Sequence, residues 1–216
     1  MLIFRRFACL IGLSMQILAQ SRPPQILQVY RDPLKPGSHA AYREIEQDIA
    51  RACAELGFPH PYLAIEPLTG PEEVWFFNGW DSEAEQKQVA DAYAKNAPLV
   101  KALETHARRK ASLASEPVNV FVNYRQDLSR GTPWRMGLGR FLVITVTRSN
   151  RRIDGTVFEA ADGTRFVLLP VKTRPEADAK AAAAGSEARV FAVRPYWSMP
   201  AKEWVAADPV FWQPTK

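Results

Sequence analysis

The sequence predicts an α+β fold built from tandem ferredoxin-like repeats, the second of which is degenerate. Residues 26–124 show strand-like and helix-like patterns in the order β-α-β-β-α-β, which is the order of the split βαβ arrangement. Residues 140–196 predict the order β-β-β-α-β, the same order with its first helix reduced to a turn. The stretch SRGTP at 129–133 breaks the composition between the two and marks the predicted boundary.

In the first unit, strands are predicted where β-prone runs end at turns, over residues 26–31, 62–66, 74–80 and 118–124. The first strand is expected to end at the turn Asp32-Pro33. A helix should follow, because apolar residues from Tyr42 to Leu56 recur every third or fourth position. Ser38 is its candidate N-cap, and Gly57 is its candidate left-handed C-cap.

The second helix of this unit is predicted to be broken in two. Ser82 and Glu85 have the spacing of a capping box, in which the two residues satisfy free amides at a helix start. The pattern is interrupted at residues 96–98, where Pro98 fits the first turn of a new helical segment.

The second unit contains the strongest hairpin signal of the sequence, Asp162-Gly163 between two β-prone runs. A strand should precede this hairpin, and an alanine-rich helix closed by Gly185 and a last strand should follow it. A closing helix over 198–207 and an apolar tail over 209–212 complete the prediction. The chain is thus divided into a ferredoxin-like half over 22–129 and a degenerate half over 130–216.

A signal peptide is predicted over residues 1–21. A basic pair precedes an uncharged run over residues 7–19, which has the length of a signal h-region and is shorter than the ~20 residues of a spanning helix. Small residues allow cleavage after Ser21, with cleavage after Ala19 as the alternative. We therefore expect an exported protein, periplasmic or extracellular, with no stable membrane insertion once the signal is removed.

Composition and charge exclude several classes of protein. The 216 residues are 47% hydrophobic and 24% charged, as in an ordinary globular chain, so extensive disorder is excluded. The basic clusters at 108–110 and 151–152 are short and are interpreted as solvated surface, and no nucleic-acid partner is expected. Cys53 is the one cysteine left after signal removal, which excludes an intramolecular disulfide; it is expected to be a small buried hydrophobic residue.

The motifs of common catalytic and metal sites are absent from the sequence. The three histidines, His39, His60 and His106, lack the spacing of a zinc motif, and neither a Gly-x-Ser-x-Gly elbow nor a phosphate-binding loop occurs. The neighbouring acids Glu44 and Glu46 are interpreted as surface charge. The sequence therefore predicts no catalytic residue, no metal and no cofactor.

Aromatic residues give the clearest indication of a binding site. Trp75 and Phe77 share one face of the third strand, and Trp80 lies on the opposite face, so one face should meet the helices and the other an opposed sheet. Both faces can be plain core. Alternatively, Trp75 or Trp80, together with Tyr93 and His106, lines a pocket for a flat apolar ligand.

A pair of asparagines is a second marker of this pocket. Asn119 and Asn123 lie on one face of the last strand of the first unit, with Phe121 between them. Polar side chains on a covered sheet face need hydrogen-bond partners, so these two residues are candidate ligand contacts.

Residues 25–127 resemble the dimeric α/β-barrel superfamily, which includes antibiotic-biosynthesis monooxygenase-like and NIPSNAP-like proteins. Two stretches carry the resemblance: LKPG at 34–37 with Tyr42 behind it, and WDSEA at 80–84, where a tryptophan ends the third strand. In that superfamily two ferredoxin-like units press their sheets together into a barrel. The resemblance implies that the second half supplies the second sheet here, which gives a single-chain dimeric-type α/β barrel and a monomer with an internal pseudo-dimer.

Members of the superfamily that catalyse reactions bind an aromatic or haem-like ligand between sheet and helices. The haem-degrading relatives use an asparagine on the first strand and a histidine on the later helix. This chain has Gln28 on that strand, and no histidine follows Trp80 before His106, so haem degradation is not expected.

Three hypotheses for the function follow. The first is an exported barrel protein that binds a small hydrophobic or aromatic ligand without catalysis. The second, implied by the resemblance, is a cofactor-free monooxygenase-like enzyme. The third is a protein-interaction module that docks a partner through the apolar tail Val210-Phe211-Trp212.

Overall fold

The structure of the chain is a computed structural model that describes residues 22–131 and 134–212. The signal peptide expected at residues 1–21 lies outside the described residues and stays a prediction. The elements of the first half are β1 (Ile26–Pro33), α1 (His39–Glu55), β2 (Leu63–Pro67), β3 (Glu73–Trp80), α2 (Glu83–Lys95), α3 (Ala97–Lys110) and β4 (Val118–Tyr124).

The second half contains four strands and a helix, and short helical segments precede and follow them. Its elements are the 3-10 turn η2 (Met136–Leu138), β5 (Phe141–Thr147), β6 (Thr156–Ala160), β7 (Arg165–Val171), α4 (Arg174–Ala184), β8 (Ala188–Val193), the 3-10 turn η3 (Pro195–Trp197), α5 (Lys202–Ala207) and α6 (Pro209–Trp212). The order β5-β6-β7-α4-β8 is the order predicted from the sequence.

The strands of the described residues form one closed barrel with the order β1-β3-β2-β8-β5-β7-β6-β4. The first half contributes the neighbours β4-β1-β3-β2. If β5 to β8 are counted as strands one to four of a second unit, that unit has the same order, four-one-three-two, which is the ferredoxin-like order. The tandem repeat inferred from element order is therefore confirmed.

The two halves join at two equivalent antiparallel seams. At one seam β2 pairs with β8, with Ile65 opposite Val193, and at the other β4 pairs with β6, with Asn123 opposite Glu159. In each case the second strand of one unit meets the fourth strand of the other. This is the self-complementary contact of a two-fold dimer, made here within a single chain.

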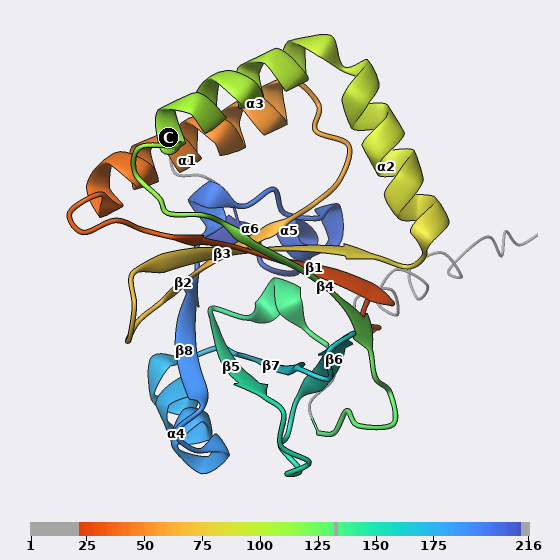
Figure 1. Ribbon diagram of the computed structural model, residues 1–216. Coiled ribbons are helices and arrows are strands. Elements are labelled where there is room, and N and C mark those ends of the chain that lie inside the picture. Colours follow the sequence, from red (N-terminus) through yellow and green to blue (C-terminus); the bar gives the residue numbers. More distant parts are fainter. Residues whose placement is uncertain (1–21, 132–133, 213–216) are drawn as a thin grey trace, which may run out of the picture.

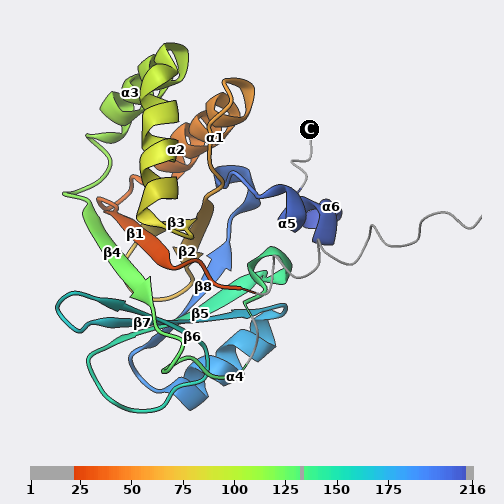
Figure 2. The same ribbon diagram turned by 90° about the vertical axis from the view of Figure 1, so that its right-hand side faces the viewer.

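Helices cover the outer faces of the barrel on opposite sides. Figure 2 shows α1, α2 and α3 beside the strands of the first half and α4 beside those of the second half. The helix missing from the second unit is replaced by a loop over residues 148–155, in which Arg151 donates a hydrogen bond to the carbonyl oxygen of Ala183 near the end of α4 (2.9 Å).

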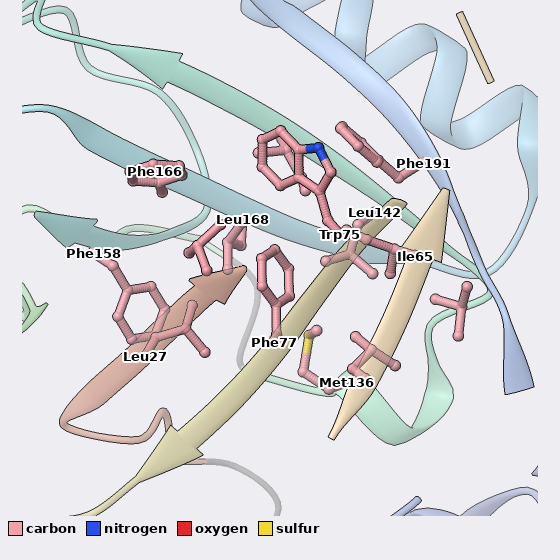
Figure 3. Close-up of a cluster of buried hydrophobic side chains, with 14 of the residues drawn as sticks. Leu27, Ile65, Trp75, Phe77, Met136, Leu142, Phe158, Phe166, Leu168 and Phe191 are labelled. Atoms are coloured by element: carbon pink, nitrogen blue, oxygen red, sulfur yellow. The ribbon is translucent and has the colours of Figure 1, made fainter. Parts of the chain in front are cut away.

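The interior of the barrel is filled with side chains from both halves (Figure 3). Trp75 lies at its centre with its ring 4.8 Å from that of Phe191 and is 2% exposed. An eight-stranded barrel has an interior just wide enough for side chains. The buried residues come from both units and are Leu27, Val29, Leu63, Ile65, Trp75, Phe77, Val122, Met136, Leu142, Ile144, Phe158, Phe166, Leu168, Phe191, Val193 and Trp212.

A buried carboxylate lies at the end of this core where β3 begins. Glu73 is 3% exposed and accepts hydrogen bonds from Arg31 (2.7 Å) and from Arg189 of the second half. Burial alone would raise the pKa of Glu73, but the hydrogen bonds from the two arginines outweigh it, so this pKa lies below its ordinary value. The Glu73 carboxylate thus links β1 and β3 of the first half to β8 of the second half on the inner face of the barrel.

Several local predictions are confirmed. Gly57 has φ +70° and follows the end of α1, and the amide of Phe58 donates to the carbonyl of Cys53, as in a Schellman cap. The hydroxyl of Ser82 accepts from the amide of Glu85 (3.1 Å). The Glu85 carboxylate accepts from the amide of Asp81, one residue before the N-cap.

Other local predictions are wrong in detail. β1 does not end before Asp32, because Asp32 and Pro33 continue the pairing with β3 opposite Val74 and Glu73. Ser38 is the N-cap residue of α1, as expected, and its carbonyl accepts from the amide of Tyr42, but its side chain makes no capping hydrogen bond. The closing helix begins only at Lys202, after the 3-10 turn and an extended stretch.

The apolar tail packs against its own chain. Trp212 is 2% exposed, and its indole nitrogen donates to the carbonyl oxygen of Gly137 (2.7 Å). The guanidinium of Arg140 lies 3.8 Å from the ring centre of Phe211. Pro209 and Val210 are the members of this tail that stay exposed. Within the described residues, Phe211 and Trp212 therefore pack against their own chain, which argues against the hypothesis that this tail docks a partner.

The shared barrel predicts that the first half does not stay monomeric alone. Without the second half, a chain of residues 22–129 exposes Leu27, Val29, Phe77 and Val122 on one sheet face, and each such side chain contributes about 1.5–3 kcal/mol when buried. We expect light scattering to show self-association of this shortened chain, and a monomer for residues 22–216. A monomeric shortened chain that unfolds cooperatively at the midpoint of the whole protein would contradict the shared core.

Candidate functional site

A groove lies between the outer face of the first-half sheet and the three helices that cover it. It has a volume of about 460 Å³, and its walls include Ile49 of α1, Tyr93 of α2 and Leu103 of α3. A second hollow of about 670 Å³ shares Tyr30, Ile49, Leu103 and Lys110 with it. The two hollows therefore adjoin at Lys110.

The groove exists because α2 stands away from the sheet. None of the residues of α2 is buried, whereas Leu99 in α3 is fully buried against α1 and the sheet. Asn96, between the two helices, accepts from the amide of Leu99 and donates to the carbonyl of Leu56 at the end of α1 (2.7 Å). In Figure 1, α2 starts beside the end of β3 and runs away from the sheet as far as this bend, from which α3 runs back beside α1.

The floor of the groove is partly aromatic and partly amide. Tyr30 of β1 and Phe76 of β3 lie with their ring centres 6.2 Å apart. Beside them, Asn78 donates to the side-chain oxygen of Gln28 (3.1 Å), and Gln28 donates to that of Asn119 (3.0 Å). A ligand on this floor would meet ring faces and polar amide groups side by side.

A buried group of charged residues forms one end of the groove. Lys110, at the end of α3, binds Asp32 of β1 (2.8 Å) and Glu46 of α1 (2.6 Å). Tyr42 donates its hydroxyl to Asp32. Asp32 is 3% exposed, Glu46 1% and the Lys110 side chain 17%. We call these four residues the Lys110 cluster.

Two carboxylates face one ammonium in the Lys110 cluster, and this governs their protonation. Burial raises the pKa of Glu46, although Lys110 acts in the opposite direction. Burial alone would lower the pKa of Lys110, but Glu46 and Asp32 raise it above its ordinary value, so Lys110 stays protonated. Burial and the charge of Asp32 raise the pKa of Tyr30 to about 12, so its hydroxyl is neutral.

The predicted tryptophans lie on opposite faces of β3, as the alternation required. Trp75 is in the packed barrel interior and lines neither hollow. Trp80 is on the helix side, where it stacks on His60 with ring centres 5.4 Å apart. It is 6% exposed and also lies outside the groove wall.

Of the two helical candidates, one lies in the groove. Tyr93 is in the groove wall and contacts Phe58 edge to face, with ring centres 6.2 Å apart. His106 lies on α3 but outside both hollows, where it forms a hydrogen bond with Arg109 (3.1 Å). The structure therefore does not bring Tyr93, His106 and the two tryptophans together in one pocket.

The asparagine pair lies on an open face. Asn119, Phe121 and Asn123 are all exposed on the outer face of β4, and Phe121 is 46% exposed. The expectation that this face is covered is therefore wrong, because the helices cover β1, β2 and β3 but leave the outer face of β4 open. Asn119 reaches the edge of the groove through Gln28.

The sequence interpretation missed the Lys110 cluster. Glu46 was expected to carry surface charge, and Lys110 to belong to a solvated basic cluster; both are corrected by their burial. One signal could have found Glu46, because it lies four residues after Tyr42 and three before Ile49 on the apolar face of α1. Nothing in the local sequence marks Lys110 as its partner, since the two are 64 residues apart.

The described residues offer little support for other kinds of site. Within residues 22–131 and 134–212, no three His, Cys, Asp or Glu side chains are grouped so as to hold a metal ion. No helix in the same ranges is both long and apolar enough to cross a bilayer. A further hollow of about 450 Å³ lies at the mouth of the barrel, with Trp134 and Trp204 in its wall. Its lining adjoins residues 132 and 133, which lie outside the described ranges.

Comparison with known proteins bears on the fold. No model of a protein family and no curated protein matches the chain. A crystal structure of a putative monooxygenase from Fusobacterium nucleatum is similar, with a TM-score of 0.50 and 10% sequence identity over 79% of this chain and 92% of that chain. A putative monooxygenase from Lactobacillus acidophilus has a TM-score of 0.45 and 7% identity, over 80% and 94%. At these identities the first likeness shows the fold alone, and it agrees with the dimeric-type α/β barrel expected from residues 25–127.

The Lys110 cluster predicts a sharp contrast between two substitutions. Lys110→Met leaves Asp32 and Glu46 buried side by side, and removal of one partner from a buried ion pair costs about 3–5 kcal/mol. Glu46→Gln keeps an acceptor for Lys110 and removes the charge in excess, so we expect a far smaller change. Chemical denaturation measures both, with Lys101→Met on the exposed side of α3 as the control.

The pH dependence gives a second measurement on the same variants. Because the pKa of Glu46 is raised in the folded protein, protonation of Glu46 contributes to the free energy of unfolding. This contribution is fully present below the ordinary pKa of 4.5 and is lost as the pH rises through the pKa of Glu46 in the folded protein. Glutamine at position 46 does not titrate. The free energy of unfolding of the Glu46→Gln variant should therefore increase relative to that of the wild type as the pH rises above 4.5. A constant difference across that range would contradict the raised pKa.

Proposed function

We propose that this protein binds a small, flat, mainly apolar molecule in the groove between β1, β3 and the helices α1, α2 and α3. The observation that carries the proposal is the groove itself, about 460 Å³ in volume, with apolar side chains in its walls and a few polar groups in its floor. Small-molecule sites commonly occupy about 300–1,000 Å³ and combine these two kinds of surface.

The groove is a better candidate than the barrel interior. Side chains of both halves fill the interior around Trp75, so a ligand there would have to displace core residues. In the groove, Ile49 and Leu103 supply apolar contacts, while Tyr30 and Phe76 offer ring faces. A planar ligand of two fused rings would contact both kinds of surface at once.

A neutral fluorescent probe tests this proposal. N-phenylnaphthylamine gains fluorescence in apolar sites, and we expect it to bind the wild-type protein with saturation. Leu103→Trp adds an indole to the groove wall and should weaken binding at least tenfold. Lys101→Trp, two residues earlier on the exposed side of the same helix, is the matched control and should bind as the wild type does.

Equal binding of N-phenylnaphthylamine by the wild type and the Leu103→Trp variant would contradict the proposal that the groove is the binding site. Such a result would place the probe elsewhere, for example at the mouth of the barrel. Circular dichroism and thermal unfolding of both variants separate a filled groove from a misfolded chain.

A second candidate function is a cofactor-free monooxygenase-like activity in the same groove. Its support is the fold shared with the Fusobacterium nucleatum protein, which is described as a putative monooxygenase. In such a reaction one atom of dioxygen would enter the ring of a hydroquinone as a hydroxyl oxygen, and the other would leave as water with two hydrogens from the substrate, so that the hydroquinone becomes a hydroxyquinone.

Oxygen uptake tests this activity. If it is present, a panel of naphthohydroquinones should consume dioxygen faster with the wild type than with Leu103→Trp, and mass spectrometry should find one labelled atom from ¹⁸O₂ in the product. A rate of dioxygen uptake equal to that of the uncatalysed oxidation across the panel would contradict catalysis. It would not bear on the proposal that the groove binds a ligand.

A further inference from the structure

Lys110 has an N–H donor left over after its contacts with oxygen atoms of the protein are counted. Its ammonium group carries three N–H bonds. One is used by Asp32 at 2.8 Å and one by Glu46 at 2.6 Å. Among residues 22–131 and 134–212, no third hydrogen-bond acceptor contacts this ammonium.

The position of Lys110 makes the remaining donor accessible to a ligand. The residue lines both adjoining hollows. Its nitrogen lies 4.8 Å from the ring centre of Tyr42 and 5.5 Å from that of Phe76. An aromatic ligand on the floor beside Phe76 would therefore present its substituent to the ammonium group.

The charge of the Lys110 cluster limits which substituent fits. Asp32 and Glu46 already balance or exceed the charge of Lys110, so a ligand carboxylate or phosphate would bring a further negative charge to two buried carboxyl groups. A neutral acceptor adds no charge and still satisfies the donor. A carbonyl oxygen is such an acceptor, and it lies in the plane of a conjugated ring.

We propose that the groove selects flat apolar molecules that carry a neutral carbonyl group, whose oxygen accepts the third N–H bond of Lys110. The proposal rests on the proposed function and adds the chemical class of the ligand. Lys110 acts by hydrogen bonding here. Its ammonium stays protonated beside Asp32 and Glu46, so it does not attack the carbonyl, and no imine forms.

Three matched probes test the selection on the wild-type protein. Acetylnaphthalene carries the carbonyl, ethylnaphthalene lacks it, and naphthoate replaces it with a carboxylate. A hydrogen bond to a charged donor in a desolvated site gives about tenfold in affinity. We therefore expect acetylnaphthalene to bind at least about tenfold more tightly than either of the other two probes in competition with N-phenylnaphthylamine.

Two variants assign the selection to the Lys110 cluster. Glu46→Gln removes one negative charge and keeps Lys110, so naphthoate should gain affinity relative to acetylnaphthalene. The triple variant Asp32→Asn, Glu46→Gln, Lys110→Met removes all three charges together and avoids an unpaired buried charge. In this variant the ratio of the affinities for acetylnaphthalene and ethylnaphthalene should fall to about one, whatever the affinity for ethylnaphthalene itself; a retained preference for acetylnaphthalene would contradict the role of Lys110.

Infrared spectroscopy measures the carbonyl stretching frequency of the bound ligand, which a general loss of protein stability does not change. The carbonyl stretch of bound acetylnaphthalene should shift to lower frequency in the wild type and return toward its value in an apolar solvent in the triple variant. An unshifted band in the wild type would overturn the hydrogen bond to Lys110.

The outcomes separate the two proposals. If none of the probes binds, the proposed function fails. If ethylnaphthalene binds as well as acetylnaphthalene, the groove binds ligands but the carbonyl selection is wrong. Tightest binding by naphthoate would likewise overturn the selection and would mean that the cluster attracts anions.

Discussion

The closure of the barrel at the seams β2–β8 and β4–β6 is the constraint on which the rest of the structure depends. Among the strands of residues 22–131 and 134–212 it pairs every sheet edge, so none of them is left open to another chain. It also commits one face of each sheet to a shared interior, which Trp75 and the phenylalanines of both halves fill. Apart from the hollow at the barrel mouth, the space for a ligand on the first sheet lies on its other face, beneath the helices, where the groove is found.

The helices over that face do two things at once. α1 and α3 seal the sheet with apolar side chains such as Leu99, yet they also carry Glu46 and Lys110 into the same layer. A carboxylate on an apolar helix face is costly unless it is paired, and its partner comes from a helix about sixty residues further along the chain. The same charged residues therefore line the groove and hold α1 against α3. A substitution of Glu46 or Lys110 should change both the groove and the packing of these two helices.

Much of the fold could be predicted from local patterns, because its signals are local. The alternation in β3 placed Trp75 and Trp80 on opposite faces, and Ser82, Asn96, Gly57 and Gly163 mark helix ends and turns through contacts within a few residues. The site was harder to predict, because it depends on tertiary contacts. Exposed Asn119 and largely buried Lys110 look alike in sequence, as polar residues near one end of a strand or helix, and only the packing of β4 and α3 distinguishes them.

The loop over residues 148–155 stands where the second unit has lost its first helix. In a barrel of two identical subunits, each substitution occurs twice, so neither sheet can lose a helix unless the other loses it too. Joining the units in one chain removes that symmetry, because each half then accumulates substitutions separately. One half can serve only to close the barrel, while the other keeps a groove for a ligand. The unequal cover of the two sheets is consistent with that freedom: among the described residues, the hollow over the second sheet has a volume of about 200 Å³, against about 460 Å³ for the groove over the first.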